Sequence, residues 1–409
     1  MRESRSFVIV GANLAGASAA ATLRDESFEG KLILIGEEPH PPYERPPLSK
    51  DYLRSKTSFD QALVRPPHYY ESHDIETLFG VRASRIDAAS RVVELDDGGR
   101  VPYDKVLVAT GGITRRLPLP GWDLEGIHDL RTVADADRIR AEIGGGARAV
   151  VVGMGFIGAE VAASLRLSGL EVTVIEAFPS PLFASLGERV GRVMEGIHRD
   201  RGVVMHFGDP VASFEGTGRV ERVTTRSGRR IDCDFVVVGV GIVPATDLLA
   251  SSGVELDNGV VVDEYCRTRV PGIYAAGDVT NHYHPLAGER MRVEHWQNAL
   301  RQGAAAARSM LGKGEPYGEV HWFWSDQYDH NLQYAGFHLQ PDTFVVRGSL
   351  EERGFVGFYL KDGRLVAAVG LDRSKELRRS MLLIKNGSPV DPAKLEDPQV
   401  DVRAAVATR

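Results

Sequence analysis

The sequence contains two glycine-rich turns of the kind that bind dinucleotides, and this duplication constrains the fold more than any other feature. The first turn lies in Val8–Gly16 and the second in Val150–Gly158. In each, a short apolar strand runs into a tight turn that opens a helix. An acidic residue then stands at the end of the next strand: Glu37 follows the strand of the first unit, and Glu176 is the last residue of the strand in the second. Backbone N–H groups at such a helix N-terminus can bind a pyrophosphate, and the acid can bind a ribose. Two such units predict two dinucleotides.

The first turn departs from the usual pattern at its middle position. Asn13 stands where the second turn has a glycine, Gly155. Asparagine tolerates a left-handed backbone better than most residues, so we expect the turn to form. Its side chain is expected to crowd the approach of the phosphate.

Later strands indicate which dinucleotide each half binds. Each half continues through a polar hairpin into a buried strand that ends in glycine, at residues 105–112 and 235–241. Only the first half is expected to be completed by a distant segment, residues 268–278, which ends in Gly277-Asp278. That carboxylate can bind the ribityl and phosphate end of FAD. The first half is therefore predicted to bind FAD and the second a nicotinamide dinucleotide.

Five short motifs give the chain a family resemblance that covers nearly its whole length. They are Arg45-Pro46-Pro47-Leu48-Ser49-Lys50, Arg131-Thr132, Gly277-Asp278, Val293-Glu294-His295-Trp296 and Trp324-Ser325-Asp326-Gln327. With them the chain resembles the NADH-dependent ferredoxin reductases of cytochrome P450 and aromatic-ring dioxygenase systems, within the glutathione-reductase structural class.

The resemblance implies an α/β fold with two Rossmann-like dinucleotide-binding domains, one for FAD and one for NADH, plus a C-terminal α+β domain. The expected boundaries are 1–113 for the first part of the FAD domain, 114–245 for the NADH domain, 246–318 for the second part of the FAD domain, and 319–409 for the C-terminal domain. Patterning predicts a helix over 294–311, a hairpin around Asp362-Gly363 and a helix over 374–386.

Composition narrows the function classes. The net charge of −7 argues against nucleic acid as a partner. The apolar run Phe7–Val10 is too short for a signal peptide or a membrane span, so we expect a cytoplasmic protein with no membrane partner. A monomer or weak dimer is expected.

The cysteines argue against disulfide chemistry. Cys233 and Cys266 are the only two, and neither lies near the N-terminal FAD segment. Disulfide reductases need a dithiol beside the flavin and peroxide-reducing relatives need one thiol there, whereas this chain has Pro46–Lys50. We expect both cysteines to be core residues.

One histidine pair has a spacing that could suit a metal site. His282 and His284 could present two ligands on one face of an extended segment, but no cysteine or carboxylate cluster accompanies them. No metal is therefore predicted.

The resemblance also implies a reaction and residue roles. Electrons would pass from NADH through FAD to a [2Fe–2S] ferredoxin that serves a P450 or a ring-hydroxylating dioxygenase. Lys50 would tune the flavin, Glu160 would be its counter-charge, and Trp324 would lie beside the flavin; these three are the predicted catalytic residues. Glu176, with no arginine nearby to neutralise a 2′-phosphate, favours NADH over NADPH.

The predicted binding residues fall into three groups, which include some of the residues named above. The FAD group is Gly11, Asn13, Ala15, Gly16, Glu37, Arg45, Lys50, Ala83, Thr110, Gly111, Arg131, Asp278, Glu294, His295 and Trp296. The NAD group is Gly153, Gly155, Phe156, Ile157, Gly158, Glu160, Glu176 and Gly241. Arg65 and Arg301 are the predicted docking residues for an acidic ferredoxin.

Two other functions use the same machinery. One is a rubredoxin or monodehydroascorbate-type reductase, which differs in its electron acceptor. The other is a redox-sensing interaction protein that resembles apoptosis-inducing factor; the lack of a basic overall charge counts against it.

Overall fold

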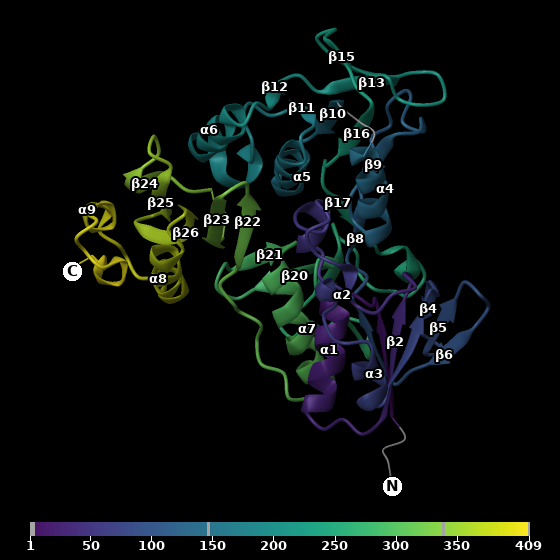
Figure 1. Ribbon diagram of the computed structural model, residues 1–409. Helices are drawn as coiled ribbons and strands as arrows, with labels where there is room; N and C mark the ends of the chain where they lie inside the picture. Colours follow the sequence, from purple (N-terminus) through teal and green to yellow (C-terminus); the bar gives the residue numbers. More distant parts are fainter. Residues whose placement is uncertain (1–4, 145–147, 338–339, 408–409) are drawn as a thin grey trace. The chain divides into compact units, whose positions relative to one another are not determined.

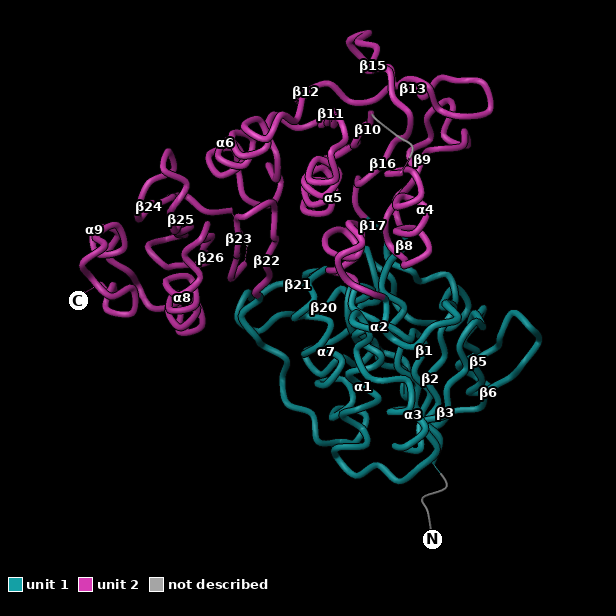
Figure 2. The backbone as a smooth tube through the Cα atoms, in the orientation of Figure 1, with its two compact units in different colours: residues 1–44, 59–113, 242–321 teal, residues 45–58, 114–241, 322–409 magenta. Residues whose placement is uncertain are grey.

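The computed structural model describes residues 5–144, 148–337 and 340–407, and these form two compact units. Unit 1 comprises residues 1–44, 59–113 and 242–321, and unit 2 comprises residues 45–58, 114–241 and 322–409 (Figure 2). The segment 45–58, which contains the Arg45–Lys50 motif, thus belongs to unit 2.

Unit 1 is built on a parallel sheet with the strand order β19-β7-β1-β2-β3. Figure 1 labels strand β2 of this sheet together with the helices α1 and α7 of the same unit. Side chains alternate along the central strand: Phe7 and Ile9 pack against the helices α1 and α7, and Val8 and Val10 pack against the opposite layer. Both faces of the strand are therefore buried, as a near-continuous apolar run predicts. The bounds are β1 Ser6–Val10, β2 Lys31–Gly36, β3 Ile75–Phe79, β7 Lys105–Val108, β19 Ile273–Ala275, α1 Leu14–Asp25 and α7 Trp296–Met310.

Unit 2 contains a second parallel sheet with the equivalent order, β12-β11-β10-β16-β9. The expectation that only the first half is completed by a distant segment is wrong, because β9 pairs with β16 although it precedes the glycine turn in the chain. The edge position is filled in both halves, from the C-terminal side in one and the N-terminal side in the other. The bounds are β9 Ile127–Asp129, β10 Arg148–Val152, β11 Glu171–Glu176, β12 Val204–Phe207, β16 Phe235–Val238, α4 Val133–Ile143 and α5 Phe156–Leu167.

The C-terminal part of unit 2 is a five-stranded antiparallel sheet with the order β22-β23-β26-β25-β24. Val369 and Leu371 on β26 pack against helix α6, whereas Gly370 between them faces Leu377 of α8. The predicted hairpin and helix are confirmed: Asp362 and Gly363 both have positive φ, as a tight hairpin turn requires. The bounds are α6 Phe183–Asp200, β22 Trp322–Gln327, β23 His330–Gly336, β24 Thr343–Ser349, β25 Gly354–Lys361, β26 Arg364–Leu371, α8 Ser374–Asn386 and α9 Pro392–Glu396.

The remaining elements are short. In unit 1 they are α2 Phe59–Ala62, α3 His68–Ser72, β4 Ala83–Asp87, β5 Val92–Leu95, β6 Arg100–Pro102, β17 Ile242–Pro244, the 3-10 helix Asp247–Leu249, β18 Val260–Val262, β20 Thr280–His284 and β21 Glu289–Met291, with β8 Gly112–Thr114 at the boundary. In unit 2 they are the 3-10 helices Pro46–Ser49 and Val402–Ala404, β13 Val211–Glu215, β14 Arg222–Thr225 and β15 Arg230–Asp232.

Candidate functional site

The first glycine turn brings helix α1 against the end of strand β1. Gly11 has a φ of 118°, and a Cβ there would lie 2.2 Å from the carbonyl oxygen of Ala109. A Cβ on Gly16 would lie 2.0 Å from the carbonyl oxygen of Gly11. Only glycine fits at either position, and no side chain caps the N-terminus of α1. The first N–H groups of a helix have no intrahelical partner, so this end can bind an anion.

Asn13 adopts an extended conformation, with a φ of −123° and a ψ of −167°. The expectation of a left-handed asparagine is wrong, because Gly11 takes the left-handed position of the turn. Gly155 is likewise extended, so the middle position does not need glycine for its backbone. The Asn13 amide donates a hydrogen bond of 2.7 Å to the Ala109 carbonyl oxygen and thereby joins the turn to the end of β7.

The second turn repeats this construction. Gly153 has a φ of 91°. Its N–H donates a hydrogen bond of 2.8 Å to the carbonyl oxygen of Ile175, and the N–H of Gly11 donates one of the same length to the carbonyl oxygen of Ile35. A Cβ on Gly158 would lie 2.0 Å from the carbonyl oxygen of Gly153. A Cβ on Gly155 would meet nothing within 4 Å. Ile157 is 46% exposed, so this helix end is open to a ligand.

Glu176 has a structural role that sequence reasoning missed. Its carboxylate is buried and accepts hydrogen bonds from the backbone N–H groups of Met154, at 2.6 Å, and Phe178, at 2.8 Å. It therefore fastens the glycine turn to the end of β11. Each carboxylate oxygen has a further lone pair that can accept a hydrogen bond from a ribose hydroxyl. Binding of a ribose by Glu176 stays a prediction. Glu37 of unit 1 follows strand β2, one residue later than the position of Glu176, and is exposed.

The other predicted FAD residues of unit 1 gather at one edge of its sheet. Gly11, Thr110 and Asp278 follow β1, β7 and β19, and the carboxyl ends of parallel strands meet at one edge. Two glycines pack closely against Ala15 at this edge. A Cβ on Gly303 would lie 2.3 Å from the Ala15 carbonyl oxygen, and a Cβ on Gly277 would lie 3.0 Å from the Ala15 Cβ.

Helix α7 begins near the predicted FAD residues Glu294, His295 and Trp296. The helix starts at Trp296 with His295 as its N-cap, which confirms the expected helix start. Glu294 is exposed and forms an ion pair with Arg292. Ala83 lies on β4, opposite Leu95 in a small antiparallel sheet, and is half-buried against the core.

Three predicted FAD residues belong to unit 2. The Arg45 guanidinium donates to the carbonyl oxygen of Arg131, and Lys50 follows the 3-10 helix that starts at Pro46. Thr132 caps helix α4 beside Arg131, in a capping box with Asp135. This box explains the Arg131-Thr132 pair as a helix start.

Lys50 and Glu160 form a largely buried ion pair, which confirms the predicted counter-charge. The Lys50 Nζ lies 2.9 Å from Glu160 Oε2, and the two side chains are 15% and 4% exposed. Ser49 donates a second hydrogen bond to the same oxygen at 2.5 Å, and Ser325 donates to Oε1 at 2.7 Å. The carboxylate thus joins the Ser49-Lys50 segment, α5 and β22.

A relay of hydrogen bonds continues from Ser325 into the protein. Gln327 donates to Ser325 at 3.0 Å and accepts from His198 Nε2 at 2.8 Å. Tyr328 donates to His198 Nδ1 at 3.1 Å. Sequence reasoning missed the roles of Ser325, Gln327 and His198; the alternation of β22 was the available signal, since residues two apart share a face.

Trp324 lies on the opposite face of β22 from Ser325. Its indole stacks on Trp322, with ring centroids 5.4 Å apart, and its N–H donates to Asp326 at 3.0 Å. On the Ser325 face, Phe323 packs edge-on against Phe156 of the second glycine turn at 4.6 Å. The role of Trp324 beside the flavin stays a prediction.

Comparison with known proteins places the chain in a family. Residues 5–303 match the family described as pyridine nucleotide-disulphide oxidoreductase, and residues 322–406 match the family described as reductase C-terminal. The chain belongs to the pyridine nucleotide-disulphide oxidoreductases.

The relatives of this oxidoreductase match over nearly its whole length. Rhodocoxin reductase of Rhodococcus erythropolis is 38% identical over 98% of the chain and 94% of the relative. The ferredoxin–NAD(+) reductase component of an anthranilate 1,2-dioxygenase system from Burkholderia cepacia is 40% identical over 97% and 98%.

Solved structures agree. The covalent putidaredoxin reductase–putidaredoxin complex matches with a TM-score of 0.95 and 34% identity, covering 98% of this chain and 97% of that chain. The ferredoxin reductase for the CYP199A2 system from Rhodopseudomonas palustris has the same TM-score and identity, covering 98% and 100%. The predicted fold and family are confirmed.

This oxidoreductase lacks an activated thiol in the part of the chain that the structure describes. Cys233 and Cys266 are both free and buried. Burial raises the pKa of the Cys233 thiol to about 12 and also raises the pKa of Cys266. The interpretation of both as core residues is confirmed, and neither favours the thiolate form at neutral pH.

Among the described residues, no helix combines the length and the apolar composition needed to cross a membrane.

Of the predicted docking residues, Arg65 is exposed and lies over the Tyr69 ring at 5.2 Å, and Arg301 is exposed on α7.

The two glycines of the second turn generate the first prediction. Gly158→Ala should lower the free energy of unfolding by about 1–3 kcal/mol or more, because its methyl group would collide with a backbone oxygen. Gly155→Ala, the matched control, should leave it within about 1 kcal/mol, because nothing lies near. Urea unfolding of both variants measures the difference, and equal losses would contradict this account of the turn.

His198 generates the second prediction. Burial lowers the pKa of His198 to about 4, although its hydrogen bond to Gln327 raises the pKa by a smaller amount. The folded protein therefore keeps the His198 ring neutral at neutral pH. The unfolded chain takes up a proton near pH 6.5, so stability is present above that pH and is lost as the pH falls toward 4. Replacement by glutamine keeps the donor to Gln327 and removes the titration.

His198→Gln should therefore flatten the fall in stability between pH 6.5 and 4, by up to about 3 kcal/mol relative to the unmodified protein. Chemical unfolding at several pH values gives the difference between the two curves. Parallel curves would show that His198 takes up its proton at the same pH in the folded protein as in the unfolded chain.

Proposed function

We propose that this protein is an FAD-dependent oxidoreductase that passes electrons from NADH to a [2Fe–2S] ferredoxin serving a cytochrome P450 or a ring-hydroxylating dioxygenase. The observation that carries the proposal is the duplicated glycine turn, which offers two dinucleotide sites, in a chain whose only two cysteines are buried and unactivated. Relatives named as ferredoxin–NAD(+) reductase components support it.

The residues of unit 1 fit FAD. The hydrogen atoms of Gly11 and Gly16 leave room where a Cβ would collide, and the uncapped start of α1 offers N–H groups to a pyrophosphate. Asp278 lies at the same sheet edge and would hold the ribityl end. FAD supplies, when bound, the conversion of a two-electron hydride donor into single electrons for an iron–sulfur acceptor.

The residues of unit 2 fit NADH. Gly153 and Gly158 repeat the close approach, and the start of α5 would bind the pyrophosphate. Glu176 would accept hydrogen bonds from the adenosine ribose. Lys50 would favour negative charge on the flavin, and Glu160 would hold the lysine ammonium in place through their ion pair.

We place this activity in the cytoplasm, where NADH is supplied. Two free, buried cysteines suit a reducing compartment.

Glu176 generates the prediction on nicotinamide choice. A buried carboxylate at the ribose repels a 2′-phosphate, so NADH should reduce the flavin roughly 5- to 150-fold faster than NADPH at limiting concentration, about 1–3 kcal/mol. Stopped-flow absorbance of the flavin measures both rates. Glu176→Gln should narrow the preference, and Glu171→Gln, at the exposed start of the same strand, should not. A preference for NADPH in the unmodified protein would overturn this reading.

The acceptor is tested with a [2Fe–2S] ferredoxin and cytochrome c. Arg65→Glu and Arg301→Glu should each slow ferredoxin-mediated cytochrome c reduction roughly threefold or more and flatten its salt dependence, because acidic ferredoxins are attracted to positive charge. NADH-to-ferricyanide turnover should stay unchanged. Arg269→Glu serves as the control. Arg269 is exposed in the same unit, but it precedes β19, whereas the predicted FAD residue Asp278 follows the other end of that strand.

The outcomes separate the alternatives. Equal losses in both assays would indicate damage to the flavin site, and no loss in either would move the docking surface elsewhere. Turnover with rubredoxin or monodehydroascorbate in place of ferredoxin would favour the reductases of those acceptors. A long-lived reduced flavin that no acceptor reoxidises would overturn the proposed function in favour of a redox sensor.

A further inference from the structure

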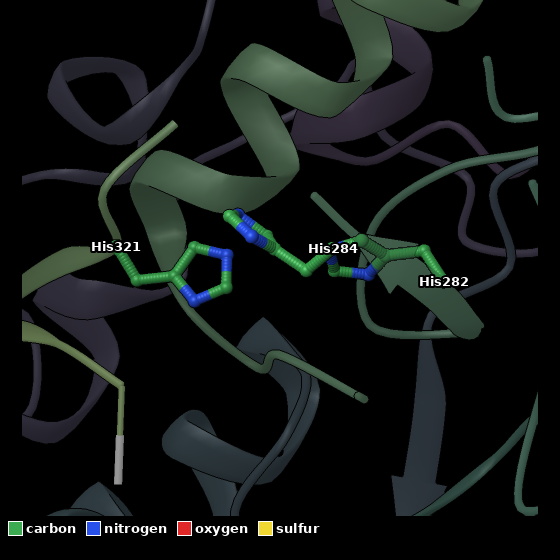
Figure 3. Close-up of side chains that lie close together, drawn as sticks. All are labelled: His282, His284 and His321. Carbon is green, nitrogen blue, oxygen red and sulfur yellow. The ribbon is translucent and has the colours of Figure 1, made fainter. Parts of the chain in front are cut away.

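Three buried histidines of unit 1 point their rings toward one another (Figure 3). His282 and His284 lie on β20 and His321 lies just before β22, and their exposed fractions are 1%, 0% and 3%. Tyr283 between the first two is 37% exposed, which shows the alternation that directs both imidazoles inward. Candidate ligand nitrogens of the three rings all lie within 4.8 Å of one another.

The strand pairing holds His282 and His284 in place. β20 lies between β18 and β21, with His282 opposite Val262 on one side and Met291 on the other. His321 approaches from a part of the chain far away in sequence, with its ring centroid 4.8 Å from that of His284 and 6.0 Å from that of His282. The sequence alone showed only the pair, and the tertiary structure supplies the third imidazole.

His282 carries the strongest sign of a missing ligand. Both of its ring nitrogens are buried and neither has a hydrogen-bond partner among the described residues. An imidazole has one N–H donor and one acceptor, and burying either without a partner is costly. A ligand that binds a ring nitrogen would remove part of this cost.

His284 is oriented as a metal ligand would be. Its Nε2 lies 2.9 Å from the backbone carbonyl oxygen of Glu319, and since a carbonyl only accepts, Nε2 carries the hydrogen. The lone pair of the neutral ring is then on Nδ1. Metal-binding histidines commonly donate their other N–H to a backbone carbonyl in this way, which fixes the tautomer and the ring.

Neutral imidazoles are the form that binds metal ions. Burial lowers the pKa of His282 to about 3, with contributions from His284 and Arg290, and burial lowers the pKa values of His284 and His321 as well. Protons therefore do not compete for these nitrogens at neutral pH. Tyr317, which also contacts His282 and His284, donates its hydroxyl hydrogen to Asn298 at 3.0 Å.

We propose that His282, His284 and His321 bind one divalent transition-metal ion, zinc in the first place. Three imidazoles suit zinc, which takes nitrogen ligands at about 2.0–2.1 Å and leaves a fourth position for water. In a tetrahedral site the nitrogens are roughly 3.4 Å apart, so the most distant pair needs to close by up to about 1.4 Å. The ion would fasten the segment before β22 to strand β20 within unit 1. Its binding goes beyond the proposed electron transfer and does not depend on it.

The test uses the full-length, flavin-loaded protein without a histidine tag. After removal of metals with a chelator, titration with zinc sulfate should show one ion per chain, and thermal unfolding should shift to higher temperature. His282→Asn and His321→Asn should each weaken binding by roughly two orders of magnitude. His68→Asn, at an exposed histidine of the same unit, should bind like the unmodified protein.

A second measurement needs no variant, so the test survives if the variants do not fold. X-ray absorption at the zinc edge of the loaded, unmodified protein should show about three imidazole nitrogens at about 2.0–2.1 Å. Absence of zinc binding, equal binding by His282→Asn, or a first shell without imidazole would each overturn the proposal. Those results would make the cluster a set of neutral, buried histidines that hold no metal. Zinc binding without NADH oxidation would leave this proposal standing and count only against the proposed function.

Discussion

The close approach of a helix to the end of a strand is the constraint on which both halves of the molecule depend. At Gly16 and at Gly158, a Cβ would lie 2.0 Å from the backbone oxygen of the glycine that opens the turn. A backbone oxygen cannot move away without breaking the turn, so only hydrogen fits. This contact sets each helix N-terminus at the carboxyl edge of its sheet, where the neighbouring strands deliver Thr110 and Asp278 in one unit and Glu176 in the other.

The carboxylate of Glu160 imposes a second constraint within unit 2. Moving a charge into the interior costs several kcal/mol unless it is paired and hydrogen-bonded. Here Ser49, Lys50 and Ser325 provide the partners, and each comes from a segment outside α5. The charge therefore specifies how the segment after Arg45 and strand β22 pack on the helix. A lysine held in this way keeps its ammonium at a defined place, which a flexible surface lysine does not.

The buried histidines show two ways of placing an imidazole in a protein interior. His198 has partners on both nitrogens, Gln327 and Tyr328, and its surroundings account for it fully. His282 is as deeply buried and has no hydrogen-bond partner among the described residues. Burial alone therefore does not separate the two histidines. The count of satisfied nitrogens does, and it distinguishes a structural histidine from a candidate ligand.

The sequence by itself determined the α/β class, the two dinucleotide turns, the lack of a redox thiol and, through the family resemblance, the pairing of Lys50 with Glu160. These features were readable because glycine positions, apolar runs and strand-end acids act over a few residues. The same reasoning misplaced the left-handed residue of the first turn, which is Gly11, where a Cβ would also collide with the backbone of Ala109, far along the chain. Only the tertiary structure decided that β9 completes the second sheet, that Ser325 reaches Glu160 and that His321 joins the histidine pair. Each of these depends on strand pairing or packing between distant segments, and no local pattern encodes which distant segment arrives.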